Sequence, residues 1–254
     1  MKPLVTAALA TLALTGCTTA APEPTPTPMV DGTLAGTVTV FAAASLTESF
    51  AAIAEAFTAE HPNVEVIFNF GGSSGLATQI VEGAPVDVFA AASPATMTTV
   101  TDAGFATDPA DFATNTLEIA VPTDNPRGVT GLADFANPDF TIALCAVEVP
   151  CGAAAAKALD TAGIVASVDT YEQDVKAVLT KVEFGEVDAG LVYRIDVLSA
   201  AGAVKGIEFP EAAGAVARYP IATLSDSAAA AAFVAFVLSD AGQQILRNVG
   251  FGAP

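Results

Sequence analysis

Strand patterns and helix patterns alternate along almost the whole chain, and the first two pairs constrain the fold most. In VTVFAAASLTESF a short apolar strand runs into an amphipathic helix that is expected to begin at Ser45. In VEVIFNFGGSSGLATQI alternating apolar residues predict a strand, Gly71 to Gly75 a turn, and the following residues a second helix. Each junction places a serine, Ser45 or Ser73, where a strand turns into a helix.

Such junctions favour the binding of small anions. The first turn of a helix offers unpaired backbone N–H groups and a partial positive charge, so it holds an anion without a basic side chain. Two junctions that face one cleft therefore predict an anion site that contains Ser45 and Ser73.

The rest of the chain continues the alternation. The patterns predict, in order, a strand at 86–93, a helix at 94–103, strands at 117–122 and 141–145, helices at 152–163 and 175–182, strands at 188–193 and 217–224, and two C-terminal helices. This order predicts an α/β fold with largely parallel strands and crossover helices.

The charge balance excludes some classes of partner. The 254-residue chain has 9 Lys and Arg residues against 28 Asp and Glu residues, a formal net charge of −19. Nucleic acids and anionic membrane surfaces are therefore not expected partners. The same charge repels an anionic ligand at long range, so the ligand must be held by local dipoles. The hydrophobic content of 52% suffices for one large core or two smaller ones.

The N-terminus reads as an export signal. Lys2 precedes an apolar stretch, and Leu14-Thr15-Gly16-Cys17 resembles the lipobox of bacterial lipoproteins. The resemblance implies a signal peptide at 1–16 and a lipidated Cys17 that anchors the protein outside the cytoplasm. An ordinary secretory signal with an incidental cysteine is the alternative. Residues 17–36, rich in Pro and Thr, predict a flexible linker.

Two further cysteines, Cys145 and Cys151, are six positions apart in ALCAVEVPCG. Outside the cytoplasm such a pair can form a disulfide that closes a short loop. A metal site is the alternative, but no second Cys or His cluster accompanies the pair. The only histidine, His61, is expected at an exposed helix end, so no direct metal coordination and no cofactor are predicted.

The segment 71–75 also fits the G-x-S-x-G pattern of a hydrolase nucleophile elbow, with Ser73 as the nucleophile. That mechanism needs a general base. In the α/β-hydrolase fold this base is a histidine that follows the serine in the sequence, whereas His61 precedes Ser73. The lysines that remain as bases, Lys157, Lys176 and Lys181, are expected on exposed helix faces. The protein is therefore predicted not to be an enzyme, with a serine hydrolase as the alternative from another class. A lipid-anchored interaction module without a small ligand is a third class.

Two candidate binding residues also have plain structural interpretations. Ser45 opens an S-x-x-E sequence, in which its hydroxyl caps the helix and Glu48 reaches back. Tyr193 closes the apolar run of a buried strand, where its hydroxyl can bind a backbone carbonyl.

The motifs together resemble a family. VTVFAAASLTESF, FGGSSGLATQI, GAPVDVFAAAS, VPCGAAAAKAL, YEQDVKAVL, GLVY and ARYPIA resemble the molybdate-binding protein of bacterial molybdate ABC transporters, over nearly the whole mature domain. The resemblance implies a two-lobed periplasmic-binding-protein fold of type II, with a mainly parallel sheet in each lobe and the ligand between them. Lobe I would comprise 37–118 and 220–254, and lobe II 119–219.

The resemblance also implies a ligand site. The oxyanion would be bound by hydroxyl and N–H groups of Ser45 and Ser73, by the N–H groups of Cys151 and Val175, and by the hydroxyl of Tyr193. Ser74 remains an alternative to Ser73. The implied ligand is molybdate, with tungstate expected as well and sulfate as the alternative, and the implied partner is the transporter permease. The receptor is expected to be a monomer.

Overall fold

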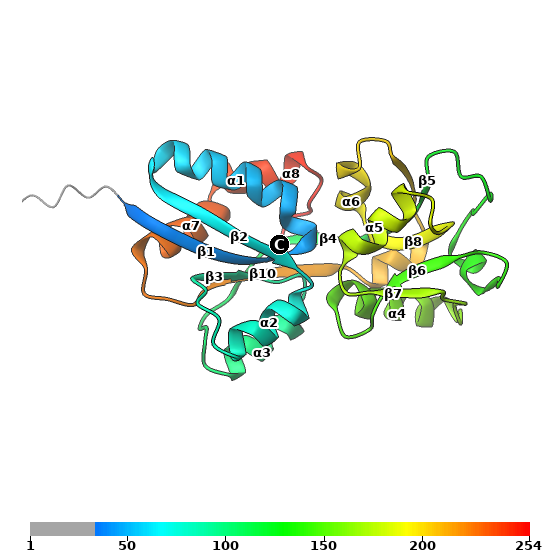
Figure 1. The fold of residues 1–254 in the computed structure, drawn as a ribbon, viewed down its shortest axis with the longest axis horizontal. Coiled ribbons are helices and arrows are strands. Elements are labelled where there is room, and N and C mark those ends of the chain that lie inside the picture. The colour runs from blue at the N-terminus through cyan, green and yellow to red at the C-terminus, as the bar shows by residue number, and fades with distance from the viewer. Residues whose placement is uncertain (1–33) are drawn as a thin grey trace, which may run out of the picture. The chain divides into compact units, whose positions relative to one another are not determined.

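Two five-stranded sheets organise the part of the chain that the computed structural model describes, residues 34–254 (Figure 1). The first sheet has the strand order β2-β1-β3-β10-β4, with β1 (Ala35–Ala43), β2 (Asn63–Gly71), β3 (Val88–Ala90), β4 (Ala110–Asn115) and β10 (Ala217–Thr223). The second has the order β7-β6-β8-β5-β9, with β5 (Leu117–Pro122), β6 (Ile142–Cys145), β7 (Thr170–Glu172), β8 (Ala189–Tyr193) and β9 (Val204–Ile207). We call each sheet with its helices a lobe. The predicted signal peptide, Cys17 and nearly all of the predicted linker lie outside the described residues.

Helices cover both faces of the first sheet (Figure 1). One face carries α1 (Thr47–Glu60), α7 (Ala228–Leu238) and α8 (Asp240–Asn248), and the other carries α2 (Ser73–Val81) and α3 (Pro94–Asp102). Successive side chains of a strand point to opposite faces. Val40 of β1 accordingly packs in the cluster that contains Phe50 and Phe57, and its neighbour Phe41 in the cluster that contains Leu76 and Ile80.

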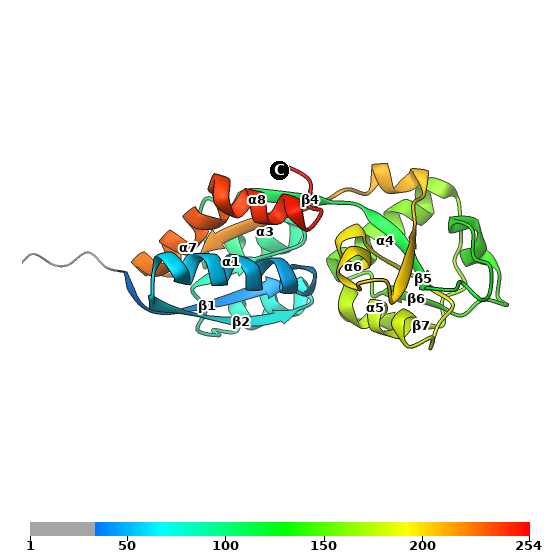
Figure 2. The ribbon, with the colours of Figure 1, turned by 90° about the horizontal axis from the view of Figure 1, so that it is seen from above.

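The second sheet is covered in the same way. Figures 1 and 2 show α5 (Val175–Glu183) and α6 (Arg194–Ser199) on the side of the sheet opposite to α4 (Pro150–Ala162). The short 3-10 helices η2 (Leu132–Ala136) and η3 (Pro210–Gly214) complete this lobe. A side chain at Gly190 of β8 would collide with Val178, so glycine allows α5 to lie close against the strand.

The expected α/β class is confirmed, but both sheets are mixed rather than mainly parallel. β1 pairs in parallel with β2 and β3, and β6 with β7 and β8, whereas β10 is antiparallel to β3 and β4, and β5 to β8 and β9. The parallel neighbours are joined through helices, as parallel pairing requires. The chain passes from one lobe to the other twice, at Thr116 between β4 and β5 and in the segment between β9 and β10. The strands that flank these two passages are the ones that pair in the antiparallel direction. β5 and β10 start where the sequence patterns place them, and the predicted lobe boundaries at 118/119 and 219/220 fall inside these two strands.

Most of the expected elements are present, with shifts at the two serine junctions. The α2 helix begins at Ser73 itself, so Gly72 alone separates it from β2 and the expected turn over Gly71 to Gly75 is wrong. Ser45 lies in the 3-10 helix η1 (Ala44–Leu46), and α1 begins two residues later. The sequence patterns did not predict β4, β7, α6 and β9, which have three to six residues each.

The apolar helix α7 belongs to the core. Its Phe233 is fully buried and packs edge-on against Phe57, with ring centroids 5.4 Å apart. No single helix in residues 34–254 is long and apolar enough to cross a membrane. Taken together, α7 and α8 reach that length and composition, but they are bent by 58°.

Candidate functional site

One small pocket is lined by residues of both lobes, and all five proposed ligand residues line it: Ser45, Ser73, Cys151, Val175 and Tyr193. Its cavity volume is about 20 Å³. Sites for drug-sized molecules have roughly 300 to 1,000 Å³, so this pocket suits a ligand of few atoms.

Three α-helices begin at the pocket. The lining residues include Ser73 at the first position of α2, Cys151 at the second position of α4 and Val175 at the first position of α5. N–H groups in the first turn of a helix have no acceptor within the helix, and the helix dipole places partial positive charge there. In α4 the first position is Pro150, which has no N–H, so Cys151 supplies the first donor of that helix. The pocket therefore collects backbone donors from three helix N-termini.

Each of the two serine hydroxyls of the pocket has a hydrogen-bond partner within the protein. Ser73 is 2% exposed, and its Oγ accepts a hydrogen bond of 3.1 Å from the backbone N–H of Ala92. The Oγ of Ser45 lies 3.0 Å from the hydroxyl oxygen of Tyr219. The capping-box interpretation of Ser45 is wrong, because no side chain caps η1 or α1. Ser74 does not line the pocket, and its hydroxyl donates to the carbonyl oxygen of Glu148 at 2.6 Å.

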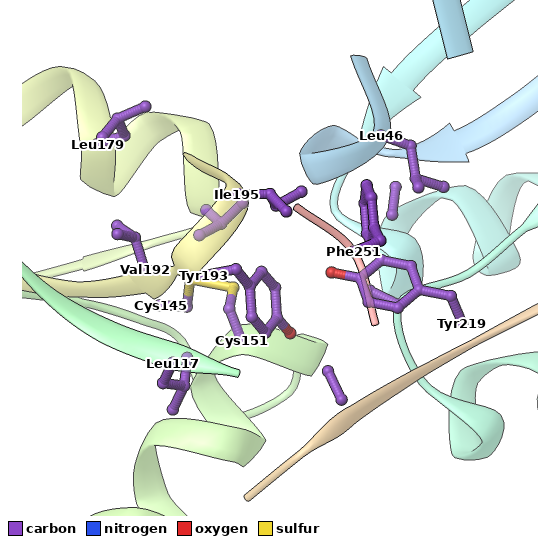
Figure 3. Close-up of a cluster of buried hydrophobic side chains, with 14 of the residues drawn as sticks. Leu46, Leu117, Cys145, Cys151, Leu179, Val192, Tyr193, Ile195, Tyr219 and Phe251 are labelled. Atoms are coloured by element: carbon purple, nitrogen blue, oxygen red, sulfur yellow. A yellow bond between two sulfur atoms is a disulfide. The ribbon is translucent and has the colours of Figure 1, made fainter. Parts of the chain in front are cut away.

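Tyr193 ends β8 with its side chain buried, and its hydroxyl has no hydrogen-bond partner in residues 34–254 (Figure 3). Burial raises the pKa of this hydroxyl well above its usual value, so it remains a protonated donor. A buried O–H without a partner is costly, by about 1 to 3 kcal/mol. A ligand oxygen in the pocket would satisfy it. Tyr193 is buried, as a core residue would be, but its hydroxyl does not bind a backbone carbonyl.

Neither Lys nor Arg is among the described residues that line the pocket. The acidic residue in the lining, Asp174, is the N-cap of α5, and its Oδ1 accepts from the N–H of Ala177 at 2.9 Å. The pocket thus presents hydrogen-bond donors to a ligand.

Lys176 lies one residue beyond the pocket and joins the lobes. Its Nζ is 2.8 Å from Oε1 of Glu48 in α1 and 3.6 Å from Oδ1 of the buried Asp196. The side chain is 23% exposed, so the expectation of a freely exposed lysine is wrong here. Beside the pocket, the Gly72 backbone also lies against the carbonyl oxygen of Gln173 in the other lobe, where a side chain would collide.

Cys145 and Cys151 form a disulfide, with Cα atoms 5.7 Å apart. The bond ties the end of β6 to the first turn of α4, and it leaves the N–H of Cys151 unaltered. Gly152 has no room for a side chain against the carbonyl of Ala146, which keeps the loop close to the helix. Among residues 34–254 no group of three or more His, Cys, Asp and Glu side chains is placed to hold a metal ion.

The hydrolase alternative lacks its base. His61 follows α1 and packs on Phe57, with ring centroids 4.7 Å apart, while Ser73 lies beyond the other end of β2. A nine-residue strand spans about 30 Å, at roughly 3.3 Å per residue. The only histidine of the chain is therefore far from the Ser73 hydroxyl.

Comparison with known proteins gives the family. Residues 38–252 match the family of bacterial extracellular solute-binding proteins. The chain is 44% identical over 245 residues to the molybdate-binding protein ModA of Mycobacterium tuberculosis, covering 95% of this chain and 93% of that protein. It is 29% identical to YvgL of Bacillus subtilis, named as an ABC transporter substrate-binding lipoprotein, over 85% of this chain and 86% of YvgL.

The solved structure of the periplasmic molybdate-binding protein of Azotobacter vinelandii has the same fold. Its TM-score is 0.72 at 20% identity, over 85% of this chain and 99% of that one. Solute-binding proteins of this kind are receptors and not enzymes. This chain belongs to the bacterial extracellular solute-binding proteins, in the family of the molybdate-binding protein ModA.

Proposed function

We propose that this protein is an extracytoplasmic receptor that binds molybdate, and tungstate as well, and delivers the oxyanion to the permease of an ABC transporter. The observation that carries this proposal is the pocket between the lobes, in which three helix N-termini and the hydroxyls of Ser45, Ser73 and Tyr193 meet without a Lys or Arg side chain in the lining. The names of the relatives supply the identity of the ion.

Such a pocket suits a dianion that carries no proton. Molybdate near neutral pH accepts hydrogen bonds and has none to donate. Hydrogen phosphate carries one O–H, which costs about 1 to 3 kcal/mol where it faces these donors and finds no acceptor. Sulfate has the same charge and the same demand for donors, so it must be rejected by its smaller size. The hydrogen bonds of a pocket fitted to molybdate would be stretched around sulfate.

The available donors are sufficient for tight binding. The hydroxyl and N–H groups of Ser45 and Ser73, the N–H groups of Cys151 and Val175, and the hydroxyl of Tyr193 make seven donors. At about 1.5 to 3 kcal/mol each for a charged acceptor, they sum to more than 10 kcal/mol. Desolvation and ordering subtract from this, which leaves a Kd on the order of tens of nanomolar.

The ligand also links the lobes. Ser45 and Ser73 belong to the first lobe, and Cys151, Val175 and Tyr193 to the second. An anion that accepts hydrogen bonds from both favours the arrangement in which the lobes are together. That arrangement is the form we propose for docking on the permease.

We further propose that Cys17 carries the lipid and that 17–36 serve as a spacer between the membrane and a monomeric receptor. The motif Leu14-Thr15-Gly16-Cys17 supports the anchor, as does the likeness to the lipoprotein YvgL. Metabolic labelling with a palmitate analogue should mark the wild-type protein and leave Cys17→Ala unmarked. Labelling of both proteins alike would remove the assignment of Cys17.

Calorimetric titration with molybdate, tungstate, sulfate and phosphate tests the ligand. We expect molybdate and tungstate to bind far more tightly than the other two, and equal binding of molybdate and sulfate would overturn the assignment. Ser73→Ala and Tyr193→Phe should each weaken molybdate binding by about 1 to 3 kcal/mol. The matched control is Tyr171→Phe, because the Tyr171 side chain lies on the surface and is 59% exposed. Unchanged affinity in both site variants would refute the proposed site.

A further inference from the structure

We propose that two contacts of the α2 start with the other lobe, made by Gly72 and Ser74, limit how closely the lobes approach and thereby set the size of the oxyanion that the pocket accepts. We call these two contacts the lobe stop. The proposal deepens the proposed function and rests on it. Ser74 does not line the pocket, so it acts as a positioning residue, through the helices whose N–H groups face the ligand.

The first contact joins the starts of α2 and α4. Ser74, the second residue of α2, donates its hydroxyl hydrogen to the carbonyl oxygen of Glu148 at 2.6 Å. Ser74 directly follows the proposed ligand residue Ser73, and the proposed donor Cys151 follows Glu148 by three positions. The bond therefore fixes the distance between two helix starts that would bind the same ion from opposite lobes.

The second contact joins the starts of α2 and α5. Gly72, the N-cap of α2, lies against the carbonyl oxygen of Gln173, and a methyl group added at Gly72 would have no room there. That added carbon would also lie 3.6 Å from Cγ1 of Val149, the N-cap of α4. Gln173 precedes the proposed donor Val175 by two positions. Because the contact with Gln173 is made by backbone atoms, it cannot yield through a change of rotamer.

The loop that carries Glu148 is held at several points. The disulfide between Cys145 and Cys151 closes the loop at both ends (Figure 3). The N–H of Val149 donates to the carbonyl oxygen of Ala146 at 3.1 Å, and the N–H of Ala146 donates to the last carbonyl oxygen of β7 at 2.8 Å. The carbonyl group of Glu148 therefore has a fixed position, as the acceptor of a stop must have.

Selection between molybdate and sulfate needs such a stop. The two ions have the same charge and carry no proton near neutral pH, so the carboxylate of Asp174 in the lining acts on both alike. Sulfate is smaller, so the helix starts of the two lobes must approach further before their N–H groups reach it. N–H···O bonds form at roughly 2.7 to 3.2 Å and weaken when they are stretched. The lobe stop prevents the closer approach and leaves sulfate with stretched bonds.

The ion pair between Lys176 and Glu48 also joins the lobes, but it is not a stop. Its atoms are 2.8 Å apart, and the two long side chains are 23% and 50% exposed. Such side chains follow a closer approach of the lobes by changing rotamer. The pair therefore adds attraction between the lobes without fixing their distance. Glu48→Gln is thus a control for the loss of a contact between lobes.

The experiment measures the dissociation constants of molybdate and sulfate by calorimetry, with competition against bound molybdate where sulfate is weak. Ser74→Ala removes the contact with α4, so the start of α4 can approach α2 around sulfate. The preference for molybdate over sulfate should fall at least about 3-fold, while molybdate binding weakens about 3- to 10-fold. Gly72→Ala thickens the stop and should act in the opposite sense. Both ions should bind more weakly, sulfate should lose more than molybdate, and the preference should rise.

Two variants serve as controls. Thr78→Ala removes a hydroxyl one turn further along α2, which donates to the carbonyl oxygen of Ser74 in its own lobe at 3.0 Å, and this variant should match wild type. Glu48→Gln should lower both affinities alike and leave the preference within about 2-fold of that of wild type. Melting curves of the unliganded proteins show whether each variant is folded.

A merely structural role predicts another pattern, because any loosening of the pocket would then lower the preference in Ser74→Ala, Gly72→Ala and Glu48→Gln alike. That pattern overturns the lobe stop, and so does an unchanged preference in Ser74→Ala. If Gly72→Ala does not fold, the comparison of Ser74→Ala with Glu48→Gln decides. Wild type that binds molybdate no more tightly than sulfate would instead refute the proposed function.

Discussion

Asp196 gives a prediction whose magnitude follows from its surroundings. The carboxyl is completely buried, its Oδ2 accepts the N–H of Tyr193 at 3.0 Å, and its Oδ1 lies 3.6 Å from Nζ of Lys176. Burial raises its pKa from the ordinary 3.8 to about 7, while Lys176 and the Tyr193 N–H act in the opposite direction and Glu48 adds to the rise. Lys176 itself is shared with Glu48, which limits how far it stabilises the carboxylate of Asp196.

The sign of the effect follows from proton binding. Between pH 3.8 and about 7 the folded protein retains a proton on Asp196 that the unfolded chain has lost. The stability contributed by this group is therefore fully present below pH 3.8 and is lost as pH rises through the folded pKa of about 7. Each pH unit in that interval costs about 1.4 kcal/mol, and the whole interval about 4 kcal/mol.

The substitution Asp196→Asn removes the titration and retains an acceptor for the Tyr193 N–H. The free energy of unfolding of the variant minus that of wild type should rise by up to about 4 kcal/mol between about pH 4 and 7.5. Urea denaturation at constant ionic strength measures both proteins, and Asp160→Asn at an exposed position of α4 serves as the control. A difference that stays constant within about 1 kcal/mol over this range would refute the assignment of a neutral, buried Asp196.

Three further predictions concern the contact between the lobes and the loop before α4. In Gly72→Ala the added methyl group would meet the carbonyl of Gln173 in the other lobe. The affinity for molybdate, measured by calorimetry, should therefore fall at least about 10-fold. The melting temperature of the unliganded protein, measured by thermal melts, should be unchanged. Glu48→Gln breaks the partly exposed ion pair with Lys176. The affinity for molybdate should fall less than about 5-fold, and the loss should vanish at high salt. A larger loss that does not depend on salt would show that the ion pair is not its cause. Reduction of the disulfide that joins β6 to α4 should weaken molybdate binding without abolishing it, because the proposed donor is the backbone N–H of Cys151. Loss of all binding would show instead that the disulfide is essential to the conformation of the loop.

Local patterns predicted those elements whose signals are strong over a short stretch. β5 has the expected bounds, α3 starts at Pro94 as expected, and α4 ends before Gly163, which has a left-handed φ of 67°. The patterns failed for β4, β7, β9 and α6, because three to six residues carry too little periodicity to be distinguished from loops. The mixed direction of the sheets also escaped them, because strand direction depends on the path of the chain between lobes.

The proposed ligand residues were accessible from the sequence for a related reason. Ser73, Cys151 and Val175 stand at helix starts, and a helix start is a local signal that also supplies the donors. Ser45 was placed by the same reasoning, although its hydroxyl bonds Tyr219 rather than capping its own helix. The resemblance to a family supplied the roles of Cys151, Val175 and Tyr193.

The sequence by itself determined the α/β class, the helix starts near Ser45 and Ser73, and the lack of a histidine after Ser73, because these depend on residue type and on short-range periodicity. Only the tertiary structure decided which residue bonds the hydroxyl of Ser45 and which side chains pair between the two lobes. Ser45 meets Tyr219 over 174 positions, and Lys176 meets Glu48 over 128. Contacts at such separation leave no local pattern, since they arise where the chain crosses between two sheets and returns. The physical reason is that a side chain's hydrogen-bond direction is set by its neighbours in space, and those neighbours come from remote strands.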